Sequence, residues 1–543
     1  DKAAPSCASG STSTCYVITA SSGSLSTSAS NKFKVANASA SKLAFSTQPG
    51  GGSAGSSWST QPVVAIQDTY GNVVSSASNS VSLTITSPNG ASLVCSSNPK
   101  AASSGSSSFS NCKINKTGTY TLTATATGLS SATSTSFTIT AGSASTLAIN
   151  GGNSQSVVAG TAVPTTPSVI VKDSSGNPVS GVSVTFAVAS GSGTATGTTT
   201  TTDAAGLATV GGWTLGTAAG SNTLTATSGS LTGSPVTFTA TGTAGAASKL
   251  AFTTQPVGGS AGSALATQPV VKIQDANNNT VSSSDLVTLS FSNNAGSGTL
   301  GGTRTVSAVN GVATFSGLNV DKVGTGYTLQ AGSGSLQTAI SSSFSITAGA
   351  ASQLRFSVQP SNRNAGQAFS PSVTVQDAYG NTVSTSTASI SLSINSNPGS
   401  GTLSGSNSLA ATSGVASFPN LSINKSGVGY TLTATSGSLT ATESDAFNIS
   451  AGAANKLAFN TQPKNSGVNS TLAAVELQIQ DSLGNLVSDA TNSIALGFGS
   501  NPGSATLSGG ASQPSTGGST TFSNLQVSAA GDHYTLTATS SGL

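Results

Sequence analysis

Hydrophobic and polar residues alternate with a period of two through most of the chain. In residues 63–68, Val64 and Ile66 share one face of the segment, whereas Ala65 and Gln67 lie on the other. The runs SVSLTIT (80–86) and GVATFSGL (311–318) alternate in the same way. Such runs, bounded by Gly, Asn, Pro and Ser, predict β-strands with one buried face. No window shows the helical period with capping residues, so the pattern predicts an all-β protein.

Two sequence markers recur five times along the chain. The first is a hydrophobic run that ends in Asp, as in VVAIQDTYGNVV and VTVQDAYGNTV. The second is YTLTAT or a close variant, and both markers recur every 102 to 105 residues. The aspartates are Asp68, Asp173, Asp275, Asp377 and Asp481, and the second marker includes Tyr120, Asn222, Tyr327, Tyr430 and Tyr534. Two independent markers with one period establish a tandem repeat.

The markers divide the chain into one partial unit and five repeats. Residues 1–41 match only the C-terminal part of a unit, and the last repeat stops after its YTLTAT strand. The predicted boundaries are 42–145 for repeat 1, 146–248 for repeat 2, 249–352 for repeat 3, 353–455 for repeat 4 and 456–543 for repeat 5. About five small residues, as in AGSAS (141–145), join one repeat to the next, so we expect a rod of domains with restricted hinging.

Each repeat has the length and strand content of an immunoglobulin-like β-sandwich. About seven short strands in about 100 residues, with turn signals between them, are typical of this fold. The DxxGN element after the first marker predicts an Asx-type turn, because Gly and Asn tolerate positive φ. The Tyr of the second marker follows a Gly-containing turn, as the tyrosine-corner residue of these sandwiches does. The predicted fold is a linear array of antiparallel, immunoglobulin-like sandwiches.

Charged residues are scarce, and this excludes several classes of function. The 543 residues include 17 Lys and Arg, 14 Asp and Glu, and one His, with a net charge of +3. No basic run is present, so we expect no nucleic-acid partner, and no apolar stretch is long enough for a membrane span. A single histidine leaves little for acid–base chemistry, so we expect neither an enzyme nor a cofactor. The neutral, hydroxyl-rich composition favours an extracellular or cell-surface location.

The four cysteines agree with an oxidising compartment. Cys95 and Cys112 flank a loop in repeat 1, and Cys112 takes the hydrophobic position that Leu318 has in repeat 3. We expect a disulfide between them, with buried free thiols as the alternative. Cys7 and Cys15 are a second neighbouring pair. Because Cys7 aligns with the position of Cys112, its partner could also lie upstream of this chain.

The ends of the array leave two interpretations open. The chain is either a window of a longer array or a subunit whose last repeat is completed by another molecule. In the second case, the N-terminal segment with Phe33 and Val35 adds a strand to repeat 5 of a neighbour, and such head-to-tail contacts generate a filament. The same segment duplicates the Tyr-bearing strand that repeat 5 already has, which argues against simple strand donation.

The five repeated aspartates are weak candidates for calcium ligands at the joints between repeats. Calcium needs six to eight oxygen ligands, usually with several carboxylates. Each repeat has only one to four acidic residues. Capping of the DxxGN turn is therefore the favoured role of Asp68, Asp173, Asp275, Asp377 and Asp481.

Other motifs give weaker signals. His533 follows Asp532, but no Ser in a nucleophile-elbow context accompanies it. Residues 296–301 match GxGxxG without the strand and helix that this motif requires. Trp58 and Trp213 are candidates for stacking on sugars, but a shared sugar platform is not repeated along the chain. No catalytic or cofactor-binding residue is assigned.

The repeats resemble bacterial immunoglobulin-like repeats of invasin- and intimin-type surface proteins. Repeat 2 is most similar, in VVAGTAVPTTPSVIVKDSSGNPVSGVSVTFAV, TTTDAAGLATVGGWTL and SNTLTAT. KLAFTTQP and GVATFSGL resemble repeats of large bacterial surface and secreted proteins. The resemblance implies the sandwich fold, a surface location and a spacer role, without a specific activity.

These observations predict a structural repeat protein of an extracellular bacterial fibre or surface stalk. Its expected partner is itself, head-to-tail and in lateral contacts. One alternative is an adhesin module that binds host or surface glycans. The other is an accessory region of a larger secreted enzyme.

Overall fold

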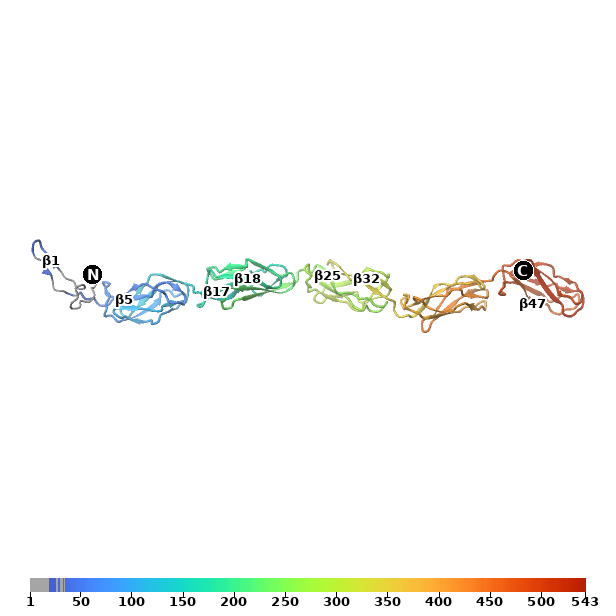
Figure 1. Ribbon diagram of the computed structural model, residues 1–543, viewed down its shortest axis with the longest axis horizontal. Helices are drawn as coiled ribbons and strands as arrows, with labels where there is room; N and C mark the ends of the chain where they lie inside the picture. Colours follow the sequence, from blue (N-terminus) through green and yellow to red (C-terminus); the bar gives the residue numbers. More distant parts are fainter. Residues whose placement is uncertain (1–18, 26–27, 30–32, 34) are drawn as a thin grey trace. The chain divides into compact units, whose positions relative to one another are not determined.

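The computed structural model of the chain describes residues 19–25, 28, 29, 33 and 35–543. These residues form strands and turns, which confirms the all-β prediction. Among them, no helix is long and apolar enough to cross a membrane. Figure 1 shows that each bundle of strands is drawn in one colour range, so one contiguous stretch of sequence builds it.

Each repeat contains a three-stranded sheet that begins with its opening strand. The opening strand pairs antiparallel with the strand that leads to the repeated aspartate, and this strand also pairs with a short third strand. In repeat 1, Leu43 lies opposite Ile66, and both side chains are buried as their alternation predicts. The strands are β3 (Lys42–Thr47), β5 (Val63–Gln67) and β9 (Ser106–Ser108); β15 (Ala144–Gly151), β17 (Ser168–Asp173) and β21 (Leu207–Thr209); β25 (Lys249–Thr254), β26 (Val270–Gln274) and β30 (Val312–Thr314); β35 (Gln353–Val358), β37 (Ser372–Gln376) and β41 (Val415–Ser417); and β47 (Lys456–Thr461), β48 (Val475–Gln480) and β52 (Ser519–Phe522).

A second layer of strands forms around the YTLTAT marker. The marker strand pairs antiparallel with a middle strand and, in repeats 1 to 4, with the closing strand. These strands are β6 (Ser80–Ile85), β11 (Gly118–Tyr120), β12 (Leu122–Thr125) and β14 (Phe137–Thr140); β18 (Ser183–Ser190), β23 (Gly220–Thr227) and β24 (Val236–Thr243); β27 (Leu286–Asn293), β32 (Gly324–Gly332) and β34 (Phe344–Ile346); β38 (Ser389–Ile394), β43 (Gly427–Tyr430), β44 (Leu432–Thr435) and β46 (Phe447–Ser450); and β49 (Ser493–Ser500) and β54 (Thr535–Ser540). Among the described residues, repeat 5 has no closing strand.

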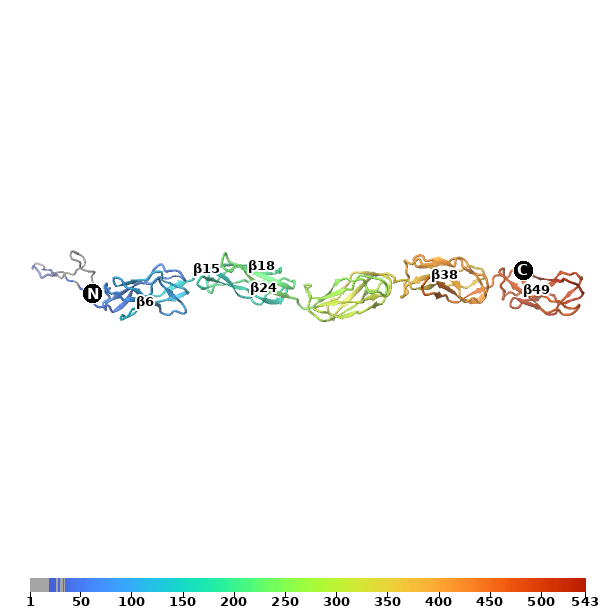
Figure 2. The ribbon, with the colours of Figure 1, turned by 90° about the horizontal axis from the view of Figure 1, so that it is seen from below.

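A short strand after the opening strand runs parallel to the closing strand. β4 (Gly52–Ser53) pairs with β14, β16 (Gln155–Val158) pairs with β24, and β36 (Arg363–Asn364) pairs with β46. Because the opening strand belongs to the first sheet, this segment carries the chain from one layer to the other. Figure 2 shows β15, β18 and β24 within the strand bundle of repeat 2.

The remaining strands are two or three residues long and form small edge pairs. They are β1 (Thr19–Ala20), β2 (Ser28–Ala29), β7 (Leu93–Val94), β8 (Lys100–Ala101), β10 (Lys113–Ile114), β13 (Ala132–Thr133), β19 (Thr194–Thr196), β20 (Thr199–Thr201), β22 (Gly212–Thr214), β28 (Leu300–Gly301), β29 (Thr305–Ser307), β31 (Asn319–Val320), β33 (Ala339–Ile340), β39 (Leu403–Ser404), β40 (Ser408–Ala410), β42 (Ser422–Ile423), β45 (Thr442–Glu443), β50 (Leu507–Ser508), β51 (Gln513–Pro514) and β53 (Gln526–Val527).

The two layers of each repeat enclose a hydrophobic core. In repeat 4, Val373 and Val375 of the first sheet meet Leu392, Tyr430 and Leu432 of the second layer. Repeats 1, 2 and 5 have separate core clusters that share no residue with one another or with repeat 4. The array therefore consists of immunoglobulin-like sandwiches, each stabilised by its own apolar interior.

The contacts divide the chain into two compact units. One unit contains Asp1–Ala246 and Asp275–Val281, and the other contains Ala247–Gln274 and Ser282–Leu543. By sequence, Asp275–Val281 contains the turn of repeat 3 that corresponds to DxxGN, with Asn278 in place of the Gly. This turn thus belongs to the same compact unit as repeat 2.

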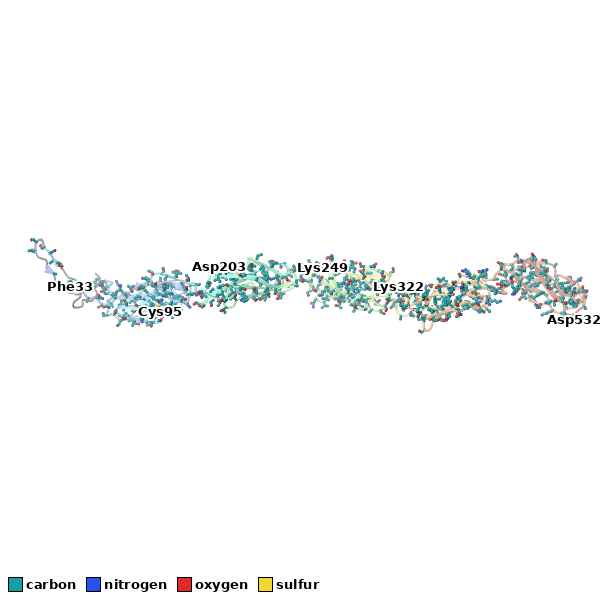
Figure 3. The ribbon with its side chains drawn as sticks, viewed as in Figure 1. Phe33, Cys95, Asp203, Lys249, Lys322 and Asp532 are labelled. Atoms are coloured by element: carbon teal, nitrogen blue, oxygen red, sulfur yellow. A yellow bond between two sulfur atoms is a disulfide. The ribbon has the colours of Figure 1, made fainter. Side chains whose placement is uncertain are left out.

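Repeat 1 contains a disulfide between Cys95 and Cys112. The Cα atoms of the two residues are 4.0 Å apart. Cys112 is fully buried in the core, as Leu318 is at the corresponding position of repeat 3. Figure 3 marks Cys95 in this repeat. Cys7 and Cys15, the other predicted pair, lie outside the described residues.

Candidate functional site

The most regular polar site in the array is the DxxGN turn, and repeat 4 illustrates it. Strand β37 ends at Gln376, and the Oδ1 atom of Asp377 accepts the N–H groups of Tyr379 and Asn381, each at 2.9 Å. Gly380 has a φ of 78°, a left-handed conformation that glycine adopts without strain. The aspartate therefore caps an Asx-type turn, as the sequence predicts.

The second carboxylate oxygen of Asp377 connects repeat 4 to the segment that precedes it. Its Oδ2 atom accepts the N–H of Gly349 at 2.9 Å and the Nδ2 of Asn381 at 2.9 Å. Gly349 lies in the short linker between the closing strand of repeat 3 and the opening strand of repeat 4. One carboxylate thus holds its own turn and the linker together.

Asn381 extends this connection into repeat 3. Its Nδ2 donates to the carbonyl of Asp321 at 2.8 Å, and its Oδ1 accepts the N–H of Val323 at 3.1 Å. Asp377 and Asn381 are only 1% and 8% exposed. We call this arrangement the junction clamp: a buried Asp–Asn pair, the linker glycine and the loop of the preceding repeat.

The junction clamp is present at all four joints between repeats. At the other three, the linker glycine donates to the aspartate at 2.8 or 2.9 Å, and the asparagine exchanges two hydrogen bonds with the preceding loop. These clamps are Asp173–Asn177 with Gly142, Asp275–Asn279 with Gly245, and Asp481–Asn485 with Gly452. Each clamp lies within one of the two compact units.

In repeat 1, the aspartate of the turn makes the same hydrogen bonds to its own turn and to the segment before the opening strand. The Oδ2 of Asp68 accepts the N–H of Ala38 at 3.1 Å, and its Oδ1 accepts the N–H groups of Tyr70 and Asn72. Ala38 precedes the opening strand of repeat 1 by four residues, and Gly452 precedes that of repeat 5 by the same number. The segment before repeat 1 is therefore hydrogen-bonded to the clamp aspartate in the same way as the linkers between repeats.

A buried tyrosine supports the clamp of repeat 4. The hydroxyl of Tyr327 donates to the carbonyl of Lys322 at 2.8 Å, which fixes the loop that Asn381 binds. The Nζ of Lys322 in turn donates to the carbonyl of Tyr379 at 2.6 Å. Tyr430 and Lys425 repeat this arrangement at the next joint. The predicted tyrosine corner thus links the cores of repeats 3 and 4 to the junctions that follow them.

Glycine is required where the turn of repeat 4 approaches repeat 3. A Cβ atom on Gly262 would lie 1.9 Å from the ring of Tyr379, and Gly262 has a φ of 75°. Any side chain would therefore displace the turn. The ring of Tyr379 thus packs against the backbone at Gly262.

In repeat 2, an asparagine replaces the supporting tyrosine. Asn222 is 1% exposed, its Oδ1 accepts the N–H of Gly216 at 3.0 Å, and its Nδ2 donates to the carbonyl of Gly220 at 3.2 Å. A Cβ on Gly191 would lie 2.1 Å from this Oδ1, just as a Cβ on Gly296 would lie 2.2 Å from the hydroxyl of Tyr327. The glycines of the GSG loops thus make room for the supporting side chain, which accounts for the GxGxxG match at 296–301.

The clamp aspartates are held in the ionised form. Burial raises their pKa, but the N–H donors of the linker glycine, the clamp asparagine and the turn outweigh this effect and leave each pKa below its ordinary value. This holds for Asp173, Asp275, Asp377 and Asp481. Protonation of these carboxyls would replace acceptors by donors, so the clamp requires the charged form.

The carboxylates of the five calcium candidates already accept hydrogen bonds from N–H donors, which argues against calcium binding. A carboxylate has about four lone-pair sites. Each of Asp68, Asp173, Asp275, Asp377 and Asp481 accepts at least four hydrogen bonds from N–H groups. In the described part of the chain, no three His, Cys, Asp or Glu residues gather at one place. The geometry favours turn capping, which leaves calcium binding to be tested.

The two tryptophans that were candidates for sugar binding are buried, whereas stacking on a sugar requires an exposed ring. Trp58 and Trp213 are 3% and 1% exposed and pack in the cores of repeats 1 and 2. Their rings therefore cannot form a stacking platform for a glycan, which agrees with the sequence, where no sugar platform is shared by the repeats. His533 lies in an exposed turn with a φ of 64°.

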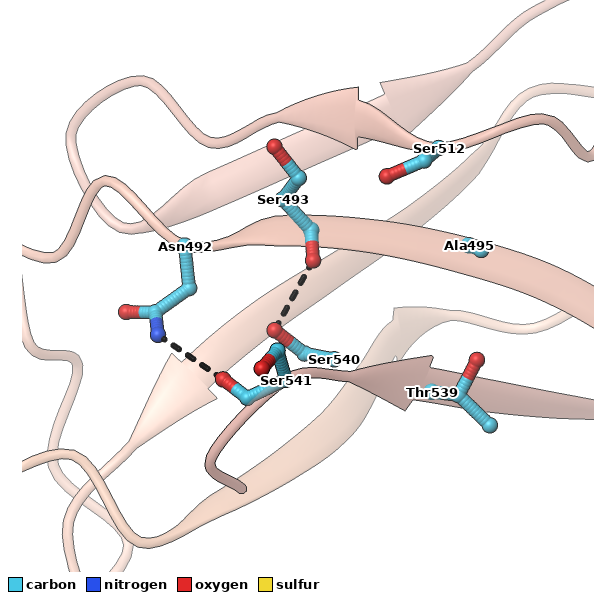
Figure 4. A pocket seen from close by; sticks show the side chains of 7 residues that line it. All are labelled: Asn492, Ser493, Ala495, Ser512, Thr539, Ser540 and Ser541. Carbon is cyan, nitrogen blue, oxygen red and sulfur yellow. Dashed lines mark hydrogen bonds between the residues drawn. The ribbon is translucent and has the colours of Figure 1, made fainter.

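A hollow of about 510 Å³ lies on repeat 5, over strands β49 and β54. Figure 4 shows that hydroxyl and amide groups line it. The hydroxyl of Ser540 donates to the carbonyl of Ser493 at 2.8 Å, so part of the lining is already paired. No lining residue carries a charge or an imidazole. The hollow thus offers no group for acid–base chemistry.

Sequence reasoning identified the aspartates but missed their partners. The asparagine four residues after each aspartate and the linker glycine before each opening strand complete the clamp. A signal was present, because Asn occupies this position in all five turns, whereas the second residue after the Asp varies. Capping of the turn requires only the aspartate, so a retained asparagine indicated a second role.

No protein-family model matches the chain, and no curated protein matches it. Among solved structures, FdeC, an Escherichia coli adhesin, is 18% identical over 55% of this chain and 96% of its own, with a TM-score of 0.28. Invasin, a bacterial integrin-binding protein, is 16% identical over 73% of this chain and 76% of its own, with a TM-score of 0.26.

A surface-layer protein gives a match over more of the chain. Domains 4–9 of SbsC are 17% identical over 92% of this chain and 79% of their own, with a TM-score of 0.20. Identities and TM-scores at this level carry no argument about activity or partners. The assignment of tandem immunoglobulin-like sandwiches rests on the strands, registers and cores of this chain.

Proposed function

We propose that this chain is a structural repeat protein of an extracellular bacterial fibre or surface stalk. The observation that carries the proposal is the junction clamp, which recurs at four consecutive joints with the same donors and acceptors. A clamp of buried hydrogen bonds restricts hinging, and a stalk needs such restriction. The disulfide between Cys95 and Cys112 supports an oxidising location.

The location is tested in the producing cell. Antibodies against the repeats should label intact cells or shed fibres, and electron microscopy should find the label on extended material. Thiol labelling without reductant should leave Cys95 and Cys112 unmodified. A chain found only inside the cell, with both thiols reactive, would contradict the proposal.

We propose further that repeat 5 of the 543-residue chain accepts a closing strand from the N-terminal segment of another copy. Leu536 and Ala538 on β54 are only half-buried, whereas their counterparts in repeat 4, Leu432 and Ala434, are fully buried. β54 has β49 as its neighbour on one side and, in the described residues, no strand on the other. An unpaired strand edge over a partly open core is a site for strand addition.

The proposed donor has the register of a closing strand. Phe33 and Val35 are 40% and 50% exposed. They precede the clamp donor Ala38 by five and three residues, and Phe447 and Ile449 precede the clamp donor Gly452 by the same distances. Phe447 and Ile449 are each 2% exposed in the core of repeat 4. Donation would thus place two apolar side chains where repeat 5 lacks them.

Analytical ultracentrifugation of the chain tests strand donation. The native chain should form linear oligomers as its concentration rises, and the double variant Phe33→Asp, Val35→Asp should remain monomeric. Val309→Asp, at a residue 72% exposed on repeat 3, is the matched control and should associate as the native chain does. A monomeric native chain, or unchanged association of the double variant, would exclude this mode of assembly.

A further inference from the structure

The direction of the strands in each repeat determines how the repeat responds to a pulling force. In repeats 1, 2 and 4, a short strand after the opening strand runs parallel to the closing strand. The chain therefore comes in at one end of the sandwich and leaves at the other. Tension along the chain then acts along these strands, so their hydrogen bonds must break together. A hairpin pulled apart from its end breaks its hydrogen bonds one at a time.

One parallel connection is common to repeats 1 to 4. In repeat 1, the N–H of Leu43 donates to the carbonyl of Ser130, and the N–H of Ser130 donates to the carbonyl of Ser41, both at 2.9 Å. This bridge ties the start of the opening strand to the turn before the closing strand. The same two hydrogen bonds occur at Leu147 and Thr232, at Leu250 and Gln337, and at Leu354 and Thr440. This shared bridge does not distinguish the four repeats.

The parallel ladder to the closing strand differs between repeats. Repeat 2 has four register pairs, from Gln155 opposite Ala240 to Val158 opposite Thr243. Repeats 1 and 4 have two pairs each. Repeat 3 has a single bridge between Ser260 and Thr347. Among the described residues, repeat 5 has no such ladder.

The antiparallel ladder of the opening strand is nearly the same throughout. It has six register pairs in repeat 2 and five in each of the other repeats. The length of the parallel ladder is therefore the main difference between the strands that carry the load.

We propose that the repeats are load-bearing modules of graded mechanical strength, set by the length of this parallel ladder. Repeat 2 resists the highest force, repeats 1 and 4 follow, repeat 3 is weaker, and repeat 5 of the 543-residue chain is weakest. Forced unfolding is governed by the barrier to unfolding, and this barrier rises with the number of hydrogen bonds that must break at once. The proposal deepens the structural function proposed above and relies on it only for the biological setting.

The disulfide gives repeat 1 a second mechanical property. Cys95 and Cys112 are 17 residues apart, and their bond keeps that loop closed after the repeat unfolds. With about 3.3–3.6 Å per extended residue, the loop holds back roughly 60 Å of chain. Reduction should therefore lengthen the extension of repeat 1 by this amount and leave the other repeats unchanged.

Single-molecule force spectroscopy of the full chain, held by its two ends, tests the proposal. We expect five unfolding events at increasing force. The event that lengthens by roughly 60 Å on reduction belongs to repeat 1. An insertion of ten residues at the exposed turn Gly229–Ser230 marks repeat 2 by a longer release, and this marked event should come last, at the highest force.

A proline pair sharpens the test. The N–H of Ala159 donates to the carbonyl of Thr243 at 2.9 Å, and alternate N–H groups of a strand point to the same side, so the N–H of Val157 also faces β24. Val157→Pro should lower the peak force of the marked event to that of repeats 1 and 4. Ser156→Pro, whose N–H faces away from β24 on this edge strand, is the matched control and should keep the high force.

The force experiment tests the graded mechanical strength of the repeats independently of the proposed surface location. If repeat 2 unfolds before repeats 1 and 4, or if Val157→Pro and Ser156→Pro lower its force equally, the proposal is overturned. Should Val157→Pro not fold, the order of events in the native chain still decides. These results do not depend on surface labelling, so a chain can fail one test and pass the other.

Discussion

Loops of repeats 2 and 3 make the same clamp contacts with the Asp–Asn turn that follows them in the sequence, but these loops are supported differently. In repeat 3, the hydroxyl of Tyr327 holds the clamped loop through the carbonyl of Lys322. In repeat 2, the shorter side chain of Asn222 holds the backbone at Gly216 and Gly220. Both side chains are buried, and both lie against a glycine that leaves them room.

This comparison shows which part of the joint is under the stronger constraint. The Asp–Asn pair and the linker glycine are the same at both joints, whereas the support beneath them changes in size and chemistry. A buried carboxylate with four N–H partners tolerates few substitutions, because any lost partner leaves a buried polar group unpaired. The support only has to fix a loop, and several side chains can do that.

Removal of a clamp carboxylate should have the largest effect. Asp173→Ala leaves the N–H groups of Gly142, Ser175 and Asn177 without their common acceptor, and that of Asn177 is buried. The variant should lower the free energy of unfolding of repeat 2 by about 3 kcal/mol. Urea unfolding followed by the fluorescence of Trp213, in a Trp58→Phe background, measures this. Equal unfolding free energies with and without the carboxylate would contradict the account.

Asp203 provides the matched control for this variant. Its Oδ1 caps a turn of repeat 2 through the N–H groups of Ala205 and Leu207, each at 2.9 Å and both in the same repeat. Figure 3 marks its position on that repeat. Asp203 is exposed, so Asp203→Ala should cost about 1 kcal/mol. The excess cost of Asp173→Ala then measures the junction rather than the turn.

The two supports should differ in what they tolerate. Asn222→Ala leaves the buried N–H of Gly216 unpaired and should cost about 2 kcal/mol in the Trp213 assay. Asn222→Tyr converts the site to the form found in repeat 3 and should cost less than Asn222→Ala, because Gly191 leaves space for the larger side chain. If tyrosine is the worse of the two substitutions, the supports are not interchangeable.

Acid should weaken both kinds of joint in the same pH window. The folded-state pKa of the clamp aspartates is depressed, so their stabilisation is present above the unfolded pKa of about 3.9 and is lost as the pH falls through the folded value. At a fixed urea concentration, the Trp213 signal should therefore report unfolding of repeat 2 below about pH 4. Asp173→Ala should show a smaller change over this window.

Chelation of calcium should have no effect on either joint. The clamp carboxylates are occupied by N–H donors, so the melting temperature should be the same with a chelator and with millimolar calcium. Differential scanning calorimetry of the chain before and after exhaustive chelation checks this. A clear rise of the melting temperature with calcium would restore the aspartates as metal ligands.

Much of the fold followed from local pattern. Alternation at Val64 and Ile66 predicted buried strands, and the position of Cys112 predicted its burial, because side-chain burial in a sandwich repeats with the strand period. The clamp was harder to predict, because Asp377 and Gly349 are 28 residues apart and belong to different repeats. The burial of Trp213 was also missed, since composition alone does not tell which face of a short strand points inward.

Hydrogen–deuterium exchange of the linkers tests the central claim most directly. If the clamp holds neighbouring repeats together, the linker amides, including those of Gly349 and Gly452, should exchange as slowly as amides in the adjoining strands, because each donates to a buried carboxylate. Substitution of Asp377 by Ala should release the first linker and leave the second protected. Linker amides that exchange at the rate of an unstructured peptide in the native chain would contradict the account.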